Sequence, residues 1–139
     1  MKELIERLVR LTGPDRESDG DLLCAALGWE KRWNEIWNAH TFHRGETWQG
    51  FGTVPMFTAS IDAAMTLVPK GLRLMLAEWD DEKHLRTKGA WQAVLSKPGY
   101  DASFDAMKGY RYDHAPTPAI ALCIAALRAR SATEPKEVM

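Results

Sequence analysis

One uninterrupted apolar stretch near the C-terminus constrains the fold more than any other feature of the chain. It is TPAIALCIAALRAR, Thr117 to Arg130, and it contains no polar side chain from Ala119 to Leu127. A helix of this composition is apolar on every side, so it must be buried rather than lie on a surface. Thr117 is a suitable N-cap, Pro118 suits the first helical position, and two arginines suit the negative end of the helix dipole. We therefore expect a buried C-terminal helix as the centre of the core.

The size and charge of the chain limit the classes of protein to which it can belong. With 139 residues, 45% hydrophobic and 27% charged, it is expected to form a single soluble domain over residues 1–139. The net charge of −1 argues against an extended nucleic-acid partner. No apolar run approaches the ~20 residues of a membrane helix. The first ten residues, MKELIERLVR, interleave charges with apolar residues and do not form a signal peptide.

Three further helices are predicted before the C-terminal one. Lys2 to Leu11 is amphipathic, and Asp15 to Leu27 has an acidic first half and ends at Gly28. These two helices are expected to form a helical hairpin over residues 1–28. The segment SIDAAMTLVP predicts the third helix, with Thr58 or Ser60 as its N-cap.

The hydrophobic period then changes to that of β-strands. LRLMLAEW (72–79) alternates leucines with other side chains, AWQAVLS (90–96) predicts a second strand, and the short 110–112 segment a third. The polar connection DDEKHLRTKG contains Asp80, Asp81 and Glu82 at a predicted hairpin turn, while 100–107 is ambiguous and 132–139 is expected to fray. Residues 56–131 therefore predict a helix, an antiparallel meander of about three strands and the buried helix. The expected class is α+β, with the C-terminal helix between the sheet and other helices.

Several segments together resemble the phage ABA sandwich domain family of small bacteriophage and prophage proteins. They are GPDRESDGDLLCAALGW, VPMFTASIDAAMTLVPKGLRLML, the aromatic hairpin and TPAIALCIAALRAR. The resemblance covers most of the chain from Gly13 to Arg130 and is weakest over Glu30 to Gly52. It implies an α/β/α sandwich and a location in the cytoplasm of a bacterial host. It implies no activity, no cofactor and no catalytic residue.

Residues 29–55 are predicted to form an aromatic and glycine-rich loop segment. Trp29, Trp33 and Trp37 are spaced four residues apart, so a short helix here would place them on one face. The following RGETWQGFGTVP combines three glycines and a proline with aromatic residues, which is typical of a loop. Aromatic loops of this length are often functional. We therefore expect the site in this segment.

Motifs for metal binding and catalysis are weak. His40 and His43 form an H-x-x-H pair that could bind zinc with a third ligand such as Glu46, although solvated histidines are the default interpretation. Cys24 and Cys123 lie in apolar helices, where thiols are inert core residues in a reducing compartment. No nucleophile–base pair is visible, so we expect neither an enzyme nor a cofactor.

A weak anion signal lies ahead of the third predicted helix. Gly50 and Gly52 precede a helix N-terminus, where free N–H groups can bind phosphate. Their spacing matches neither the Walker loop nor G-x-G-x-x-G, so a plain glycine-rich loop is the first interpretation and an anion site the alternative.

The tryptophans are the sharpest functional signal, because the chain has six of them and three are hard to bury in a domain of this size. Aromatic faces beside guanidinium groups can stack a base and hold its phosphate. The first hypothesis is therefore a non-catalytic module that binds a small anionic, nucleotide-like ligand. The alternative is a protein-interaction or structural accessory protein whose tryptophans lie in a homo-oligomer or partner interface. The candidate binding residues are Arg32, Trp33, Trp37, Arg44, Trp48 and Thr58.

Overall fold

The computed structural model describes residues 1–79, 90–97 and 110–133, in which helices and strands alternate in groups. The helices are α1 (Lys2–Val9), α2 (Arg16–Leu27), α3 (Ile61–Met65) and α4 (Pro118–Thr133), with a 3-10 turn η1 (Phe51–Thr53). The first antiparallel sheet, the N-terminal sheet, contains β1 (Glu30–Asn34), β2 (Ala39–Arg44) and β3 (Thr47–Gly50). The second, the C-terminal sheet, contains β4 (Arg73–Trp79), β5 (Ala90–Ser96) and β6 (Tyr110–Ala115).

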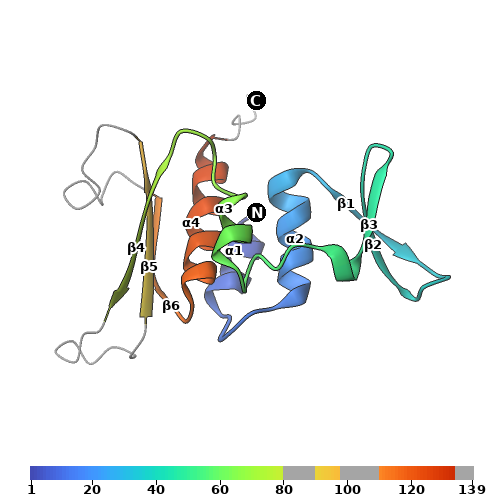
Figure 1. The fold of residues 1–139 in the computed structure, drawn as a ribbon, viewed down its shortest axis with the longest axis horizontal. Coiled ribbons are helices and arrows are strands. Elements are labelled where there is room, and N and C mark those ends of the chain that lie inside the picture. Colours follow the sequence, from blue (N-terminus) through green and yellow to red (C-terminus); the bar gives the residue numbers. More distant parts are fainter. Residues whose placement is uncertain (80–89, 98–109, 134–139) are drawn as a thin grey trace.

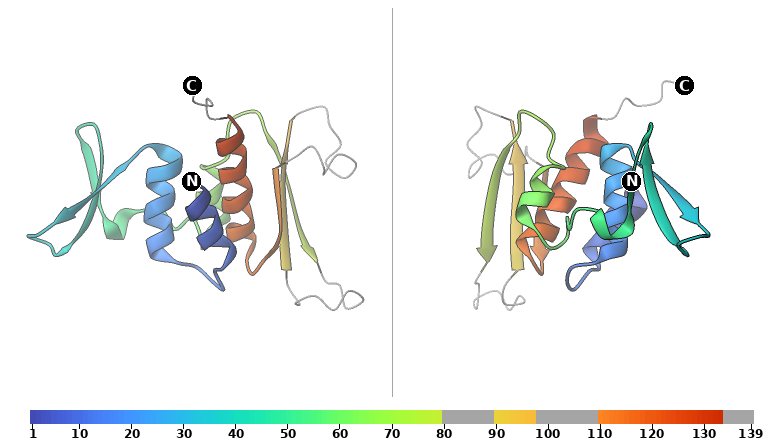
Figure 2. Two further views of the ribbon diagram at one scale, coloured as in Figure 1. Left: turned by 180° about the vertical axis from the view of Figure 1, so that it is seen from behind. Right: turned by 45° about the vertical axis from the view of Figure 1, so that its right-hand side comes forward.

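The two sheets lie at opposite ends of the molecule with the helices between them (Figure 1). Helix α4 lies beside the C-terminal sheet, and α2 lies on the side of the N-terminal sheet, an arrangement also clear from behind (Figure 2). The expected α+β class and the packing of the C-terminal helix on a sheet are confirmed. The layer order differs from an α/β/α sandwich, because the described helices all lie between the sheets. None of these helices is long and apolar enough to cross a membrane.

Helix α4 is the centre of the core, as its composition predicts. Every residue from Ala119 to Leu127 is at most 2% exposed. The helix packs against β5 and β6 on one side and against α1 and α3 on the other. At its start, the Ile120 N–H donates to Thr117 Oγ1 over 3.2 Å, which is the predicted cap. Near its end, Arg130 Nε donates to the Leu67 carbonyl over 2.6 Å and ties the helix to the chain that follows α3.

Capping residues mark both ends of α2 and the start of α3, whereas α1 and α3 are shorter than predicted and end at Val9 and Met65. Asp15 accepts from the Ser18 N–H over 3.1 Å at the start of α2. Gly28 ends α2 in the left-handed conformation, with φ of 76°, which costs glycine little. Of the two residues considered as the cap of α3, Ser60 is the one that fills the role, since it accepts from the Ala63 N–H over 3.2 Å.

The three strands predicted for the C-terminal sheet are confirmed, although β5 is buried on both faces and does not alternate in burial. Leu74 pairs with Leu95, and Ala93 pairs with Tyr112, and these side chains belong to or pack on the core. The predicted turn at Asp80 to Glu82, the ambiguous 100–107 segment and the frayed tail beyond 133 lie outside the described residues.

Residues 29–55 were predicted as a loop with a short tryptophan-lined helix, and this prediction is wrong. The segment forms the three strands of the N-terminal sheet followed by η1. Two tight turns make the meander, with Asn38 at φ of 49° and Gly45 at φ of 62°, conformations that asparagine and glycine tolerate best. β1 is almost entirely exposed, so it lacks the hydrophobic alternation by which strands are recognised.

Both cysteines are free thiols, as expected for helical core positions. Cys123 is buried in α4, and its Sγ donates to the Phe57 carbonyl over 3.2 Å. Burial raises the pKa of both the Cys24 and Cys123 thiols, so both remain protonated at neutral pH. Neither is a reactive nucleophile.

The central place of α4 predicts the outcome of a single charge substitution. Ile124→Asp buries an unpaired carboxylate, whose cost of several kcal/mol approaches the whole stability of a domain, about 5–15 kcal/mol. We expect no cooperative thermal transition by circular dichroism. The matched control is Ile36→Asp, since Ile36 is 91% exposed and its replacement leaves the transition in place. A soluble, cooperatively melting Ile124→Asp variant contradicts the central role of α4.

Candidate functional site

The N-terminal sheet docks onto α2 through one aromatic side chain. Phe42 of β2 is fully buried and lies against Gly20, within the first half of α2. A Cβ atom at position 20 would lie 2.7 Å from Phe42 Cζ, closer than real Cβ atoms approach. Gly20, which costs helix propensity, is therefore required for the close approach of the sheet.

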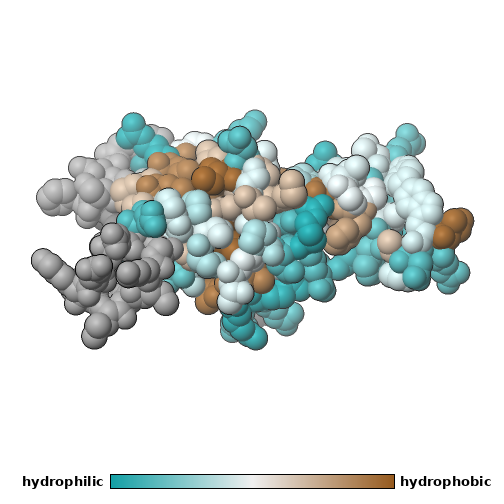
Figure 3. Space-filling view, turned by 60° about the horizontal axis from the view of Figure 1, so that its bottom comes forward, coloured by the Kyte–Doolittle hydropathy of each residue, from teal (hydrophilic) through white to brown (hydrophobic). Residues whose placement is uncertain are grey.

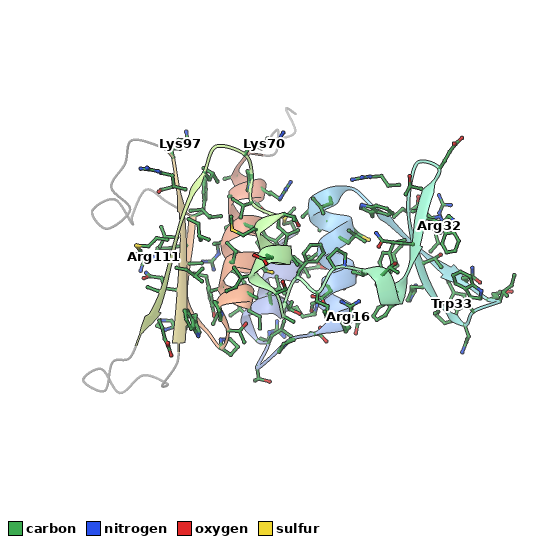
Figure 4. The ribbon with its side chains drawn as sticks, in the orientation of Figure 1. Arg16, Arg32, Trp33, Lys70, Lys97 and Arg111 are labelled. Carbon is green, nitrogen blue, oxygen red and sulfur yellow. The ribbon has the colours of Figure 1, made fainter. Side chains whose placement is uncertain are left out.

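A buried polar network fixes the chain on both sides of η1. The Asp19 carboxylate accepts from the Thr58 N–H over 2.8 Å, from the Thr58 hydroxyl over 2.7 Å and from Arg16 over 2.9 Å. Arg16 also donates to the carbonyls of Phe51 and Val54 over 3.0 and 2.8 Å. It lies between α2 and the segment that leaves the N-terminal sheet (Figure 4). The start of α2 thus anchors the sheet as well as beginning a helix.

This network assigns Thr58 a structural role, which corrects its prediction as a ligand-binding residue. Thr58 is fully buried, and its hydroxyl accepts from the Asp15 N–H over 2.8 Å while it donates to Asp19. A side chain with no exposed surface and a satisfied hydroxyl has no contact to offer a ligand.

Charged pairs hold the inner edge of the N-terminal sheet. Lys31 Nζ of β1 contacts the Asp21 carboxylate of α2 over 3.0 Å, and Arg7 of α1 binds the same carboxylate. Burial acts to raise the pKa of Asp21, but the hydrogen bonds from Arg7 and Lys31 outweigh it and lower the pKa. Arg44 lies over the Trp29 ring at 4.9 Å from its centroid, a cation–π contact beside the end of α2.

The strand register divides the N-terminal sheet into two faces, because successive side chains point to opposite sides. Phe42, which packs on α2, identifies the inner face. The register adds Lys31, Trp33, His40 and Arg44 to that inner face. The outer face carries Arg32, Thr41, His43 and Trp48.

The outer face contains a shallow groove, which we call the aromatic groove. Its volume is about 250 Å³. The rings of Trp37 and Trp48 pack together with centroids 5.1 Å apart and planes tilted by 45°. Trp37 remains 54% exposed and Trp48 52% exposed, so their indole surfaces are available from solvent. The groove is lined by Asn34, Ile36, Trp37, Thr41, His43 and Trp48.

The β1–β2 turn explains why Trp37 lies over the sheet. The Asn34 side-chain oxygen accepts from the Trp37 N–H over 3.1 Å, which closes a local side-chain turn. Gly50 of β3 lies beneath the Trp37 ring, since a Cβ there would lie 3.9 Å from it. The turn, together with a strand residue that has no side chain, holds the ring on the outer face.

The polar groups of the groove are joined to one another. Thr41 Oγ1 and His43 Nε2 are 2.8 Å apart, and the Thr41 hydroxyl also lies 3.4 Å from the Arg32 carbonyl. With these groups engaged internally, the exposed surface of the groove consists mainly of indole rings. Such a site favours stacking and apolar contact over acid–base chemistry.

The structure brings together only two of the three tryptophans predicted as the binding set. Trp37 and Trp48 form the groove. Trp33 lies on the inner face and packs edge-on against His40, with centroids 5.1 Å apart and planes at 78°. In the view with side chains, Trp33 lies at the far end of the N-terminal sheet (Figure 4).

The two predicted binding arginines are both engaged within the chain. Arg32 forms an exposed ion pair with Glu30 at 3.1 Å, and the hydrogen bond from Arg32 lowers the pKa of Glu30. Arg44 packs on Trp29 on the inner face and donates to the Leu27 carbonyl over 3.4 Å. Neither guanidinium group lines the aromatic groove.

The histidine pair does not form a metal site. His40 and His43 lie three residues apart in a strand, and therefore point to opposite faces of the sheet. Within the described ranges, no group of three His, Cys, Asp or Glu side chains could hold a metal ion. Gly50 precedes η1 and Gly52 lies within it. The chain then continues to α3, whose five residues are too few for a helix-dipole anion site.

A second hollow lies between α1 and α2, with a volume of about 450 Å³. Two of its charged groups, Arg7 and Asp21, are bound to each other, and burial raises the pKa of its cysteine, Cys24. The paired charges have a structural role, and the thiol is not reactive, so the hollow is not a candidate site.

Sequence reasoning missed Asn34, Thr41 and His43 as groove residues, because it treated their segment as a loop. The available signal was the two-residue Gly45–Glu46 turn, flanked by residues that alternate in polarity, which is a hairpin pattern.

Comparison with known proteins adds no relative: no family model, no curated protein and no solved structure matches this chain.

The close approach of Phe42 to Gly20 predicts a destabilising glycine substitution. Gly20→Ala improves helix propensity by about 1 kcal/mol, but it forces the buried Phe42 ring to move, at a typical cost of about 1–3 kcal/mol. We expect a net loss of unfolding free energy in urea titrations.

The control for this substitution is Gly52→Ala, because a Cβ at position 52 has no atom within 4 Å. In the Gly20→Ala background, Phe42→Leu shortens the side chain and recovers part of the loss. A Gly20→Ala variant more stable than the parent shows that the ring does not pack on α2 as described.

Proposed function

We propose that the protein is a non-catalytic binding module whose binding surface is the aromatic groove. The observation that carries this proposal is the half-exposed pair Trp37 and Trp48, packed together on the sheet face that points away from the core. Exposed aromatic residues over a shallow hollow are typical of recognition sites and are costly to leave in water. The group bound there is a flat or apolar ring that stacks on indole.

The charges around the groove, among the described residues, indicate which ligands it can bind. Its lining carries no lysine or arginine, and the nearby Arg32 is held by Glu30. A nucleotide-like ligand would therefore gain its affinity from the base and little from the phosphate. This refines the anionic ligand predicted from the sequence, in which Arg32 and Arg44 were to hold the anion.

A role as a phage or prophage accessory protein stays a prediction based on the resemblance of the sequence motifs. The Gly13–Gly28 motif of that resemblance has a structural explanation, since Asp15 caps α2 and Asp19 joins the anchoring network. The motif therefore acts in folding and gives no evidence on the ligand.

A second candidate is self-association through the same surface. Ile36, a groove residue next to Trp37 in the β1–β2 turn, is 91% exposed and adds an aliphatic surface to the two indole rings. Light scattering on the wild type and on Ile36→Asp separates this candidate from ligand binding. A dimer that becomes a monomer in the variant supports it, and a monomer in both rejects it.

The proposed function predicts selective changes in the indole N–H signals of the six tryptophans. We expect a panel of neutral nucleosides, the matching monophosphates and N-acetylproline amide to contain compounds that shift the signals of Trp37 and Trp48 by nuclear magnetic resonance. The signals of Trp29 and Trp91, which pack on the core, remain in place. The nucleosides bind about as well as their monophosphates, because the groove lining has no cation.

Matched variants assign the effect to the groove. Trp48→Ala removes the response, whereas Trp33→Ala, which deletes an equally exposed tryptophan on the inner face, preserves it. A panel in which no compound shifts Trp37 or Trp48, or in which every tryptophan signal shifts alike, contradicts the proposed function.

A further inference from the structure

The aromatic groove is selective for a smaller class of ligands than all those that can stack on an indole ring. Its side-chain polar groups are used internally: Thr41 and His43 bond to each other, and Asn34 holds the Trp37 backbone. In the described part of the chain, no hydrogen bond is formed by the indole N–H of Trp37 or Trp48. The groove therefore presents half-exposed indole rings whose N–H groups form no hydrogen bond within the described residues, and a fitting ligand combines apolar rings with exposed acceptors.

The surroundings of the groove favour a ligand that is neutral or positively charged. The cation on this face, Arg32, is neutralised by Glu30 at 3.1 Å. Glu35 and Glu46 are exposed in the turns at the two ends of β2, and neither forms an ion pair within the described residues. A segment that crosses the groove along the strand direction would meet carboxylates at both ends.

The shape of the groove favours an extended segment over an enclosed small molecule. Its volume of about 250 Å³ lies below the roughly 300–1,000 Å³ of pockets that bury whole ligands. The two rings lie on the outer face of the three-stranded N-terminal sheet. This sheet lies at one end of the molecule (Figure 1). A long ligand can therefore pass over the groove without meeting the helices.

We propose that the aromatic groove binds a proline-rich segment of a partner protein in the polyproline II conformation, with basic residues on either side of the prolines. This inference rests on the proposed function and names its ligand class. Proline rings pack on indole faces, and the polyproline II backbone leaves its carbonyls free to accept from the two indole N–H groups. The helix is preformed, so little conformational entropy is lost on docking to a shallow site.

Other exposed apolar residues do not support a comparable inference. A strip of apolar residues runs along one side of the molecule beyond the N-terminal sheet (Figure 3). Ile61 and Met65 of α3 are each 41% exposed, and nothing in the described part of the chain indicates what would cover them. The aromatic groove is the surface where shape, donors and charge all point to one ligand class.

The test uses the full chain and three synthetic peptides. The probe is Lys-Lys-(Pro)6-Lys-Lys. One control replaces every lysine with glutamate, and the other replaces every proline with alanine. We expect the probe to shift the indole signals of Trp37 and Trp48 and to bind at least about threefold more tightly than its glutamate counterpart. The affinity of the probe should fall as salt is added. The alanine peptide leaves both signals in place.

Two variants connect the effect to the groove and to its charges. Trp48→Ala abolishes binding of the probe, and Trp33→Ala preserves it. The double variant Glu35→Gln, Glu46→Gln reduces the preference for lysine over glutamate flanks while leaving the Trp37 and Trp48 shifts in place.

The outcomes separate this inference from the proposed function. If nucleosides or N-acetylproline amide shift Trp37 and Trp48 but the probe does not, the proline-rich ligand is wrong and the binding groove stands. If the alanine peptide binds as well as the probe, the polyproline recognition is wrong. If no compound or peptide shifts either signal, both proposals fail.

Discussion

The buried carboxylate of Asp19 is the point on which the arrangement of the two ends of the molecule depends. Its side chain is 1% exposed, and a carboxylate in that position is stable only when its acceptors are satisfied. Thr58 supplies a backbone and a hydroxyl donor, and Arg16 supplies the charge. This one residue of α2 therefore joins the chain that leaves the N-terminal sheet to the helical core.

This anchor allows a small sheet to hold its position. The N-terminal sheet buries few side chains, chiefly Phe42 and Thr41, and a sheet with so little core needs a helix to pack against. Phe42 against Gly20 supplies the apolar contact, while Arg16 and Lys31 add polar links to either side of it. The inner face of the N-terminal sheet packs on α2, so its outer face, with Trp37 and Trp48, remains exposed to solvent.

The core elements could be predicted from the sequence because their signals are local and strong. The run Ala119 to Leu127 leaves no polar side for solvent. Gly28 ends α2 as predicted, and Ser60, one of the two predicted caps, begins α3. The leucine alternation of β4 likewise predicted a strand with one buried face. These features follow from helix and strand periodicity and from the chemistry of chain ends.

The site could be predicted only in part, because its geometry depends on strand register. Trp37 and Trp48 were identified from their type, but their neighbours Thr41 and His43 could be found only once β2 was known to be a strand. The four-residue spacing of the tryptophans suggested a common helical face, whereas Trp33 points to the opposite side of the sheet. The order of the layers could not be predicted either, because the exposed N-terminal sheet has little of the hydrophobic alternation from which strands are recognised.

The central claim is that Trp37 and Trp48 are displayed for binding and contribute little to folding. Urea unfolding of the double variant Trp37→Ala, Trp48→Ala tests it most directly, with Phe42→Ala as the buried aromatic reference. We predict that the double variant loses less stability than Phe42→Ala, which removes a fully buried aromatic side chain at a typical cost of about 3–5 kcal/mol, because about half of each indole is already exposed to water. A double variant that loses as much stability as Phe42→Ala contradicts the claim, because the tryptophans would then be part of the core.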